Sequence, residues 1–264
     1  MSDVHPVVAV VQARMTSSRL PGKVLKPLCG APLIRRVLER VLRIEGVDAA
    51  VVALAEGAAH DAVVAAVDGL GVTVVRGSES DVLARTAAAA RAANAKTVMR
   101  ITSDCPLIDP AVIDRVIGAY LGQSSRCDYV SNLHPPTYPD GNDVEICSFR
   151  ALSTAWRVAT HPSDREHTTP FFWRHPEAFR LGNVTCETGL DLSATHRIVL
   201  DYAEDYEVIR QVFDALWADN PAFGVADIVG FLDAHPEIVA INARHRTGLD
   251  TPAARDAVAV GAGR

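Results

Sequence analysis

The chain has 264 residues, of which 48% are hydrophobic, enough for the core of one α/β domain or of a domain with a small appendage. Its formal net charge of -6 excludes general attraction to nucleic acid, so any anion must be bound by a local group of cations. No segment is apolar over the roughly 20 residues that a membrane helix needs. Five cysteines without a C-x-x-C pair argue against a disulfide scaffold or a zinc site. The start of the chain lacks the features of a signal peptide, so we expect a cytoplasmic protein with reduced thiols.

Apolar runs alternate with helical patterns through the first half of the chain. Continuous apolar runs, typical of strands covered on both faces, predict strands at 7–11, 49–54, 72–75 and 97–101. Apolar residues at helical spacing predict helices at 32–44, 59–70, 80–95 and 109–121. Such alternation indicates an α/β fold with a mostly parallel, doubly wound sheet, which binds its ligand at the carboxyl ends of the strands.

The expected helix starts carry capping residues. Ser80 is the expected N-cap of the helix at 80–95. Asp109 is the expected cap of the helix at 109–121, with Pro110 at the first helical position.

The pattern changes after this first half. Residues 127–175 combine short strand-like pieces with a turn-rich segment and two helical stretches, which we interpret as an arm or insertion. A strand and then a helix starting near Ala203 are expected in 196–217, and a further helix at 225–235. We therefore predict a single domain over 1–248, followed by a flexible tail over 249–264.

The loop after the first expected strand is rich in cations. Arg14, Arg19 and Lys23 stand among hydroxyl residues and a Pro-Gly pair, in neither a Walker A nor a G-x-G-x-x-G pattern. Backbone N–H groups and three converging cations would suit the phosphates of a nucleotide. A loop that only improves solubility would have a similar composition, and spacing alone does not decide between the two.

Two aspartates are expected at the same edge of the sheet. Asp104 follows the strand at 97–101, too early to cap the next helix, and Asp201 ends the apolar run from Ile198 to Leu200. Carboxylates facing a phosphate-binding loop are well suited to Mg²⁺. Glu204 and Asp205 fall in a first helical turn, where acids favour the helix dipole, and are interpreted as structural.

The turn-rich segment offers further polar side chains. Asp143 and Glu145 form a D-x-E pair that resembles the metal-binding pair of sugar-nucleotide glycosyltransferases, although alternation with apolar residues is equally typical of an edge strand. Turn residues here could contact a polar acceptor, and a basic pair further on could hold an acidic one. The candidates for the acceptor site are Tyr138, Asp140, Asn142, Glu145, Arg165 and His167.

Several motifs occur in a characteristic order over roughly residues 7–217: QARMTSSRLPGKVLKPLCGAPL, VVRGSESDVLAR, VMRITSDCPLIDP, DYVSN, TYPDGNDVE, REHTTP and LDYAEDYEVI. In these motifs the chain resembles the SpsF-like cytidylyltransferases, within the wider group of acylneuraminate and 3-deoxy-manno-octulosonate cytidylyltransferases. The resemblance implies a three-layer, Rossmann-like (GT-A-like) nucleotidyltransferase fold with a mixed, mostly parallel sheet and an arm that builds a homodimer. It also implies transfer of CMP from CTP to an acceptor, with release of pyrophosphate.

The resemblance also implies roles for individual residues. Arg14, Lys23 and Asp104 would be catalytic, and Asp104 with Asp201 would hold the Mg²⁺ cofactor. The residues implied to lie near the nucleotide are Gln12, Ala13, Arg14, Arg19, Lys23, Arg76, Ser78, Asp81, Arg100 and Ser103.

Three hypotheses for the function follow. The preferred one is a cytidylyltransferase whose acceptor is anionic, either a sugar acid of the sialic or ulosonic type or a phosphonate or phosphorylated small molecule. The second is a glycosyltransferase of related fold that uses Asp143 and Glu145 on its metal. The third is a module that binds a nucleotide without turnover. None of them involves nucleic acid or a membrane.

Overall fold

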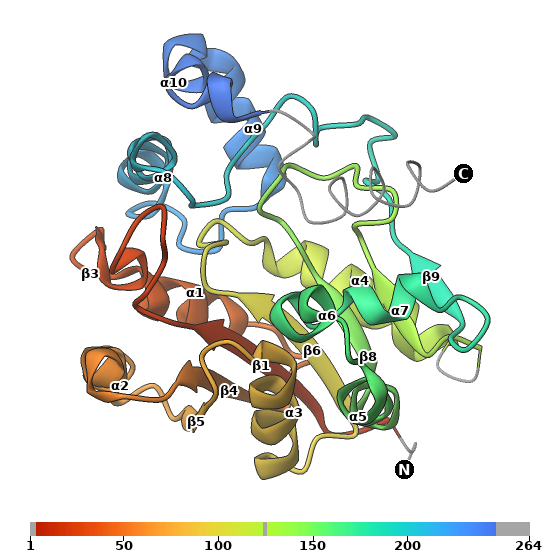
Figure 1. The fold of residues 1–264 in the computed structure, drawn as a ribbon. Helices are drawn as coiled ribbons and strands as arrows, with labels where there is room; N and C mark the ends of the chain where they lie inside the picture. The colour runs from red at the N-terminus through yellow and green to blue at the C-terminus, as the bar shows by residue number, and fades with distance from the viewer. Residues whose placement is uncertain (1–3, 124–125, 247–264) are drawn as a thin grey trace.

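The computed structural model describes residues 4–123 and 126–246, and their centre is a seven-stranded sheet in the order β5-β4-β1-β6-β8-β7-β9 (Figure 1). The strands are β1 (Val7–Ala13), β4 (Ala49–Ala55), β5 (Thr73–Gly77), β6 (Thr97–Thr102), β7 (Tyr129–Ser131), β8 (Glu145–Ser148) and β9 (Leu181–Asn183). The short strands β2 (Pro27–Leu28) and β3 (Ala31–Pro32) pair separately. Strands β5, β4, β1 and β6 are parallel, so the four strands predicted from continuous apolar runs are confirmed.

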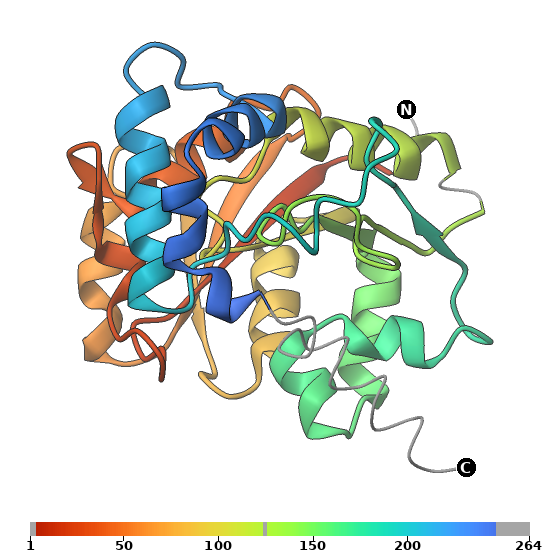
Figure 2. The same ribbon diagram turned by 90° about the horizontal axis from the view of Figure 1, so that it is seen from above.

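Helices cover both faces of the sheet. They are α1 (Leu33–Val41), α2 (Asp61–Ala66), α3 (Val82–Ala92), α4 (Pro110–Gln123), α5 (Phe149–Val158), α6 (Pro162–His167), α7 (Pro170–Arg174), α8 (Ala203–Leu216), α9 (Val225–Ala234) and α10 (Pro236–Ile241). Val7, Ala9 and Val11 pack with α1, α4, α8 and α9, whereas Val8 and Val10 pack with α3, α5 and α7. The helices α8, α9 and α10 lie together on one side of the molecule (Figure 2). This arrangement confirms the predicted three-layer α/β class.

No helix in the described part of the chain has the length and apolar character needed to span a bilayer.

Two helix starts test the predicted caps. Ser80 is not the N-cap of α3: Asp81 takes that position, and its Oδ1 accepts from the N–H of Ala84 at 2.9 Å. The prediction was one residue early because Ser78 Oγ accepts from the N–H of Asp81 and turns the chain there. Asp109 caps α4 as predicted, since its Oδ1 accepts from the N–H of Ala111 at 2.7 Å.

The segment predicted as an arm contributes strands to the central sheet. Strand β8 pairs with β6 on one side and with β7 on the other, both antiparallel, so the expectation of an edge strand at Val144–Ile146 is wrong. The polar residue that suggested an exposed face, Glu145, is buried and paired inside the protein. The loop at 132–144 and the helices α5, α6 and α7 lie outside the sheet, and the part of this segment in a dimer stays a prediction. The predicted tail at 249–264 lies outside the described residues.

Residues 196–201 do not form the predicted strand. They run as an extended segment across the carboxyl edge of the sheet, where the N–H of Ile198 donates to Asp140 O at 2.7 Å and that of Leu200 to Asp104 O at 2.8 Å. The apolar run misled the prediction because Ile198 and Leu200 are buried against the helical layer rather than by pairing in the sheet. The helix after it does begin at Ala203.

Gly141 permits the close packing of this segment. Its φ is +111°, and a Cβ there would lie 2.5 Å from Val199 N and 2.7 Å from the carbonyl carbon of Ile198. Gly141→Ala is therefore expected to lower the free energy of unfolding by about 2 kcal/mol or more in urea titrations. The control Gly118→Ala, in α4 with open space around the new methyl group, should be neutral or stabilising by about 1 kcal/mol or less. Equal effects of the two changes would contradict this account.

Candidate active site

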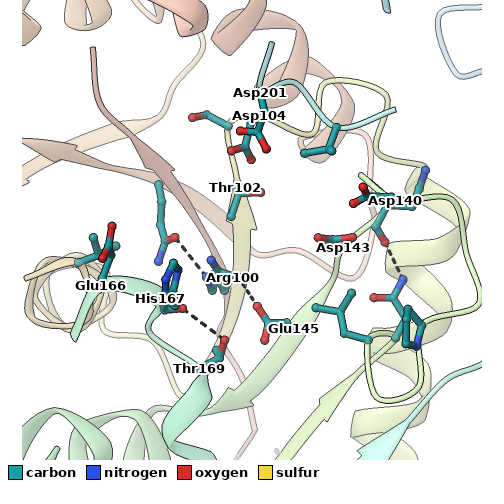
Figure 3. A pocket seen from close by; sticks show the side chains of 18 of the residues that line it. Arg100, Thr102, Asp104, Asp140, Asp143, Glu145, Glu166, His167, Thr169 and Asp201 are labelled. Atoms are coloured by element: carbon teal, nitrogen blue, oxygen red, sulfur yellow. Dashed lines mark hydrogen bonds and ion pairs between the residues drawn. The ribbon is translucent and has the colours of Figure 1, made fainter. Parts of the chain in front are cut away.

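The carboxyl ends of β1 and β6 open into a cavity of about 680 Å³. Its walls come from the loop after β1, the start of α3, residues 132–145, the α6–α7 segment and residues 193–201. Figure 3 shows Glu166 and His167 on one side of this space and Asp140 and Asp143 on the other, with Asp104 and Asp201 near each other. The sheet edge expected to bind a ligand is thus the edge that is hollow.

Lys23 joins the two aspartates. Its Nζ donates to Asp104 Oδ2 at 3.1 Å, to Asp201 Oδ1 at 3.1 Å and to Leu200 O at 2.6 Å. The side chain reaches this point because Gly22, at φ +70°, turns the loop just before Lys23. The carboxylates that the sequence placed at one edge of the sheet therefore meet on a single ammonium group.

The charges of this trio stabilise one another. Burial alone would raise the pKa of Asp104, but the charge of Lys23 and a hydrogen bond from Thr102 outweigh it and lower that pKa to about 2. Burial alone would lower the pKa of Lys23, but Asp104 and Asp201 raise it above its ordinary value. Both the ammonium and the Asp104 carboxylate are therefore charged at neutral pH.

The other predicted cations lie around Lys23. Arg19 Nη2 is 2.9 Å from Asp201 Oδ1. Arg14 lines the same cavity beside Arg85, whose pKa is lowered to about 10 by burial and by the charge of Arg14. Arg85 was not predicted, because an arginine in an Ala-rich helix ordinarily suggests an exposed face. Together these side chains make this end of the cavity electropositive.

A buried polar chain crosses the floor of the cavity. Arg100 donates from Nε to Gln12 Oε1 at 3.1 Å and from Nη1 to Glu145, whose other oxygen accepts from the Tyr129 hydroxyl at 2.5 Å. Gln12 in turn donates to Thr168 at 3.0 Å. Because both oxygens of Glu145 are engaged, the arrangement disfavours a metal held by the D-x-E pair.

A second group of acidic side chains lines the cavity. Asp140 Oδ2 accepts from Arg197 Nη1 at 2.9 Å, yet burial and the nearby Asp201 raise the pKa of Asp140 to about 6. Burial and the charges of Asp140 and Glu145 raise the pKa of Asp143 to about 8. Arg197 also lies 3.5 Å from Asp201, so this group of acids is next to the Lys23 trio, and the raised pKa of Asp143 keeps its carboxyl group mostly uncharged at neutral pH.

A second network holds the Asp201 turn. Arg197 Nε donates to Asp205 Oδ1 at 2.9 Å, and Asp205 Oδ2 accepts from the backbone N–H groups of Asp201 and Tyr202, each at 2.9 Å. Asn242, beyond α10, donates to Asp205 Oδ1 at 3.0 Å. Asp205 is thus structural, as predicted, and it fixes the backbone that carries Asp201.

Fourteen predicted site residues line the cavity: Gln12, Ala13, Arg14, Arg19, Lys23, Arg100, Ser103, Asp104, Tyr138, Asp140, Asn142, Glu145, His167 and Asp201. Four others do not line it. Arg76 extends from the edge strand β5 and pairs with Asp61, while Ser78 and Asp81 shape the start of α3. Arg165 lies 3.3 Å from Asp81, outside the cavity. Cavity residues that the preferred prediction missed include Arg85, Asn132, His134, Asp143, Trp173 and Arg197.

This architecture recurs in proteins of known family. Residues 8–222 match the family model described as Cytidylyltransferase. The chain belongs to the cytidylyltransferase family. The predicted SpsF-like resemblance is confirmed, and with it the place of the chain among nucleotidyltransferase enzymes.

Three relatives illustrate the breadth of this cytidylyltransferase family. The chain is 28% identical to the spore coat polysaccharide biosynthesis protein SpsF of Bacillus subtilis, over 89% of this chain and 97% of that protein. It is 40% identical to a 3-deoxy-manno-octulosonate cytidylyltransferase of Anaeromyxobacter sp. over 44% of this chain and 48% of that protein. A solved cytidylyltransferase structure from Leptospira borgpetersenii superposes with a TM-score of 0.83 at 29% identity, covering 88% of this chain and 96% of that one.

Proposed function

We propose that this protein transfers CMP from CTP to a small anionic acceptor and releases pyrophosphate. The observation that carries the proposal is the contact of Lys23 with both Asp104 and Asp201, beside Arg14 and Arg19, in a cavity at the carboxyl edge of the sheet. A triphosphate carries about four negative charges, so this group of cations would bind it more strongly than a neutral ligand.

In the proposed reaction an acceptor oxygen attacks the α-phosphorus of CTP. The bond between the α- and β-phosphates breaks, pyrophosphate leaves, and the proton of a hydroxyl acceptor passes to solvent. Arg14, Arg19 and Lys23 stabilise the charge that develops on the α-phosphate and on the leaving group. The protein acts mainly by holding the two substrates in line in a cavity that restricts access of water.

The residues present suit a divalent cation. Asp104 and Asp201 offer hard carboxylate oxygens that converge where a positive charge, that of Lys23, is already held. Mg²⁺ usually keeps several of its waters and is bound through one or two carboxylates, so these two aspartates would suffice. Bound by Asp104 and Asp201, Mg²⁺ would supply Lewis-acid stabilisation of phosphate oxygens.

The acceptor in this proposal is a sugar acid or a phosphonate or phosphorylated small molecule. The names of the SpsF and 3-deoxy-manno-octulosonate cytidylyltransferase relatives support a role in carbohydrate biosynthesis. His167, which lines the cavity, remains a candidate contact for the acceptor, whereas Arg165 points to Asp81 and is not proposed for this role.

Incubation with CTP, Mg²⁺ and a panel of such acceptors tests the proposal. We expect pyrophosphate and a CMP conjugate to form in equal amounts, faster with CTP than with ATP or GTP. Transfer of a sugar from a nucleotide sugar, without pyrophosphate from CTP and any acceptor of the panel, would refute it.

A further inference from the structure

The acidic end of the cavity contains one carboxyl group without a cationic partner. Arg100 is paired with Glu145, and Arg197 with Asp140. Asp143 lies among these acids and forms no ion pair with any cation of the described residues; its nearest polar contact is the N–H of Gly141 at 3.4 Å. An ionised carboxylate in such surroundings is unfavourable, so the raised pKa keeps Asp143 mostly protonated at neutral pH unless a ligand supplies a positive charge.

Asn142 gives an independent indication that a ligand binds here. It is only 1% exposed and lines the same cavity, and its side-chain nitrogen has no hydrogen-bond partner in the described chain. Its side-chain oxygen accepts from the N–H of Asp109 at 2.8 Å, which fixes the orientation of the amide and prevents a flip. Buried donors without a partner are rare in proteins, so an oxygen atom of a ligand is expected beside this nitrogen.

Aromatic side chains from two segments line the same cavity. The rings of His134 and Trp173 lie with their centroids 4.2 Å apart, and both residues line the cavity. Burial lowers the pKa of His134, so its ring is neutral at neutral pH and adds no positive charge. Neutral aromatic rings next to carboxylates favour a cationic group that carries some apolar surface.

We propose that this end of the cavity binds a positively charged amino group of the acceptor at Asp143, with a neighbouring hydroxyl oxygen at Asn142. The inference rests on the proposed function and narrows the acceptor to an amino sugar or amino alcohol that also carries the reacting anionic group. Its anionic group faces Lys23, and its ammonium group faces Asp143. A bound ammonium ion would favour the ionised carboxylate and so lower the raised pKa of Asp143.

A matched pair of probes tests the inference. 2-Aminoethyl phosphate and 2-hydroxyethyl phosphate differ only in the amino group, and their binding to the protein is measured by calorimetry in the presence of Mg²⁺. We expect the amino compound to bind the native protein about tenfold more tightly or better. The isosteric change Asp143→Asn should abolish this preference, while Asp219→Asn, an exposed acid away from the cavity, should retain it.

The outcomes separate the two proposals. Equal binding of the two probes by the native protein, or no binding of the amino compound, would overturn the assignment of Asp143, whatever the variant does. Binding of CTP alone is measured in parallel, as a test of the nucleotide site that does not depend on the acceptor. A protein that prefers the amino compound but forms no pyrophosphate from CTP with any acceptor would refute the proposed reaction and leave the amino-group site standing.

Discussion

Replacing Lys23 with Met is expected to lower kcat/KM for CTP-dependent transfer by about 10²–10³-fold, the range observed when one preorganised charge or hydrogen-bond donor is removed from a transition state. Lys23 is 8% exposed and contacts both Asp104 and Asp201, so solvent screens its charge only weakly. Met keeps the length of the side chain and removes the charge. Steady-state kinetics with pyrophosphate detection measure the effect.

Lys23→Met should also have an effect in the absence of catalysis, on the pKa of Asp104. Without Lys23 the pKa of Asp104 is expected to rise above its value of about 2, since Lys23 is the main cause of its lowering. Lys96→Met is the matched control, because Lys96 is exposed and precedes β6 at the opposite edge of the sheet. If Lys23→Met retained near-native kcat/KM, or if Lys96→Met were equally impaired, Lys23 would have no special part in catalysis.

The fold was predictable where a segment is buried by sheet pairing and by helices at the same time. The run at 7–11 is apolar throughout and the run at 97–101 at all positions but Thr97 and Arg100, because both faces of β1 and β6 are covered. The run that ends at Leu200 has the same appearance, yet it is buried by a helical layer and forms no strand. Composition reports burial, whereas pairing depends on neighbours that are distant in the sequence.

The site was predictable to a similar degree. Lys23 and Asp104 come together because each follows a strand that ends at the same sheet edge. Asp201 also reaches Lys23, but on the extended segment 196–201 and not at the end of the predicted strand. Arg76 and Arg165 do not line the cavity, because Arg76 on β5 pairs with Asp61 and Arg165 in α6 pairs with Asp81. Arg197 was overlooked because its contacts are with acids that no spacing rule connects to it.

Asp205→Asn is expected to destabilise the protein by about 3–5 kcal/mol, as when one partner of a buried ion pair is removed. Asp205 is fully buried and pairs with Arg197, and it accepts from two backbone N–H groups at the Asp201 turn. The variant leaves the charge of Arg197 without its principal partner. Urea unfolding measures the effect, and Glu204→Gln is the control, an acid in the same helical turn outside the buried network.

The pH dependence of the free energy of unfolding shows whether the ion pair between Asp205 and Arg197 causes this effect. Burial alone would raise the pKa of Asp205, but the hydrogen bonds and charge of Arg197 outweigh it, so the folded pKa lies below the usual value of about 3.9. Ionised Asp205 therefore stabilises the fold fully above the unfolded pKa, and this contribution is lost as the pH falls through the folded value. The stability difference between native protein and Asp205→Asn should thus be constant at neutral pH and shrink in acid. A difference that is independent of pH down to acid unfolding would show that packing, not the ion pair, holds the Asp201 turn in place.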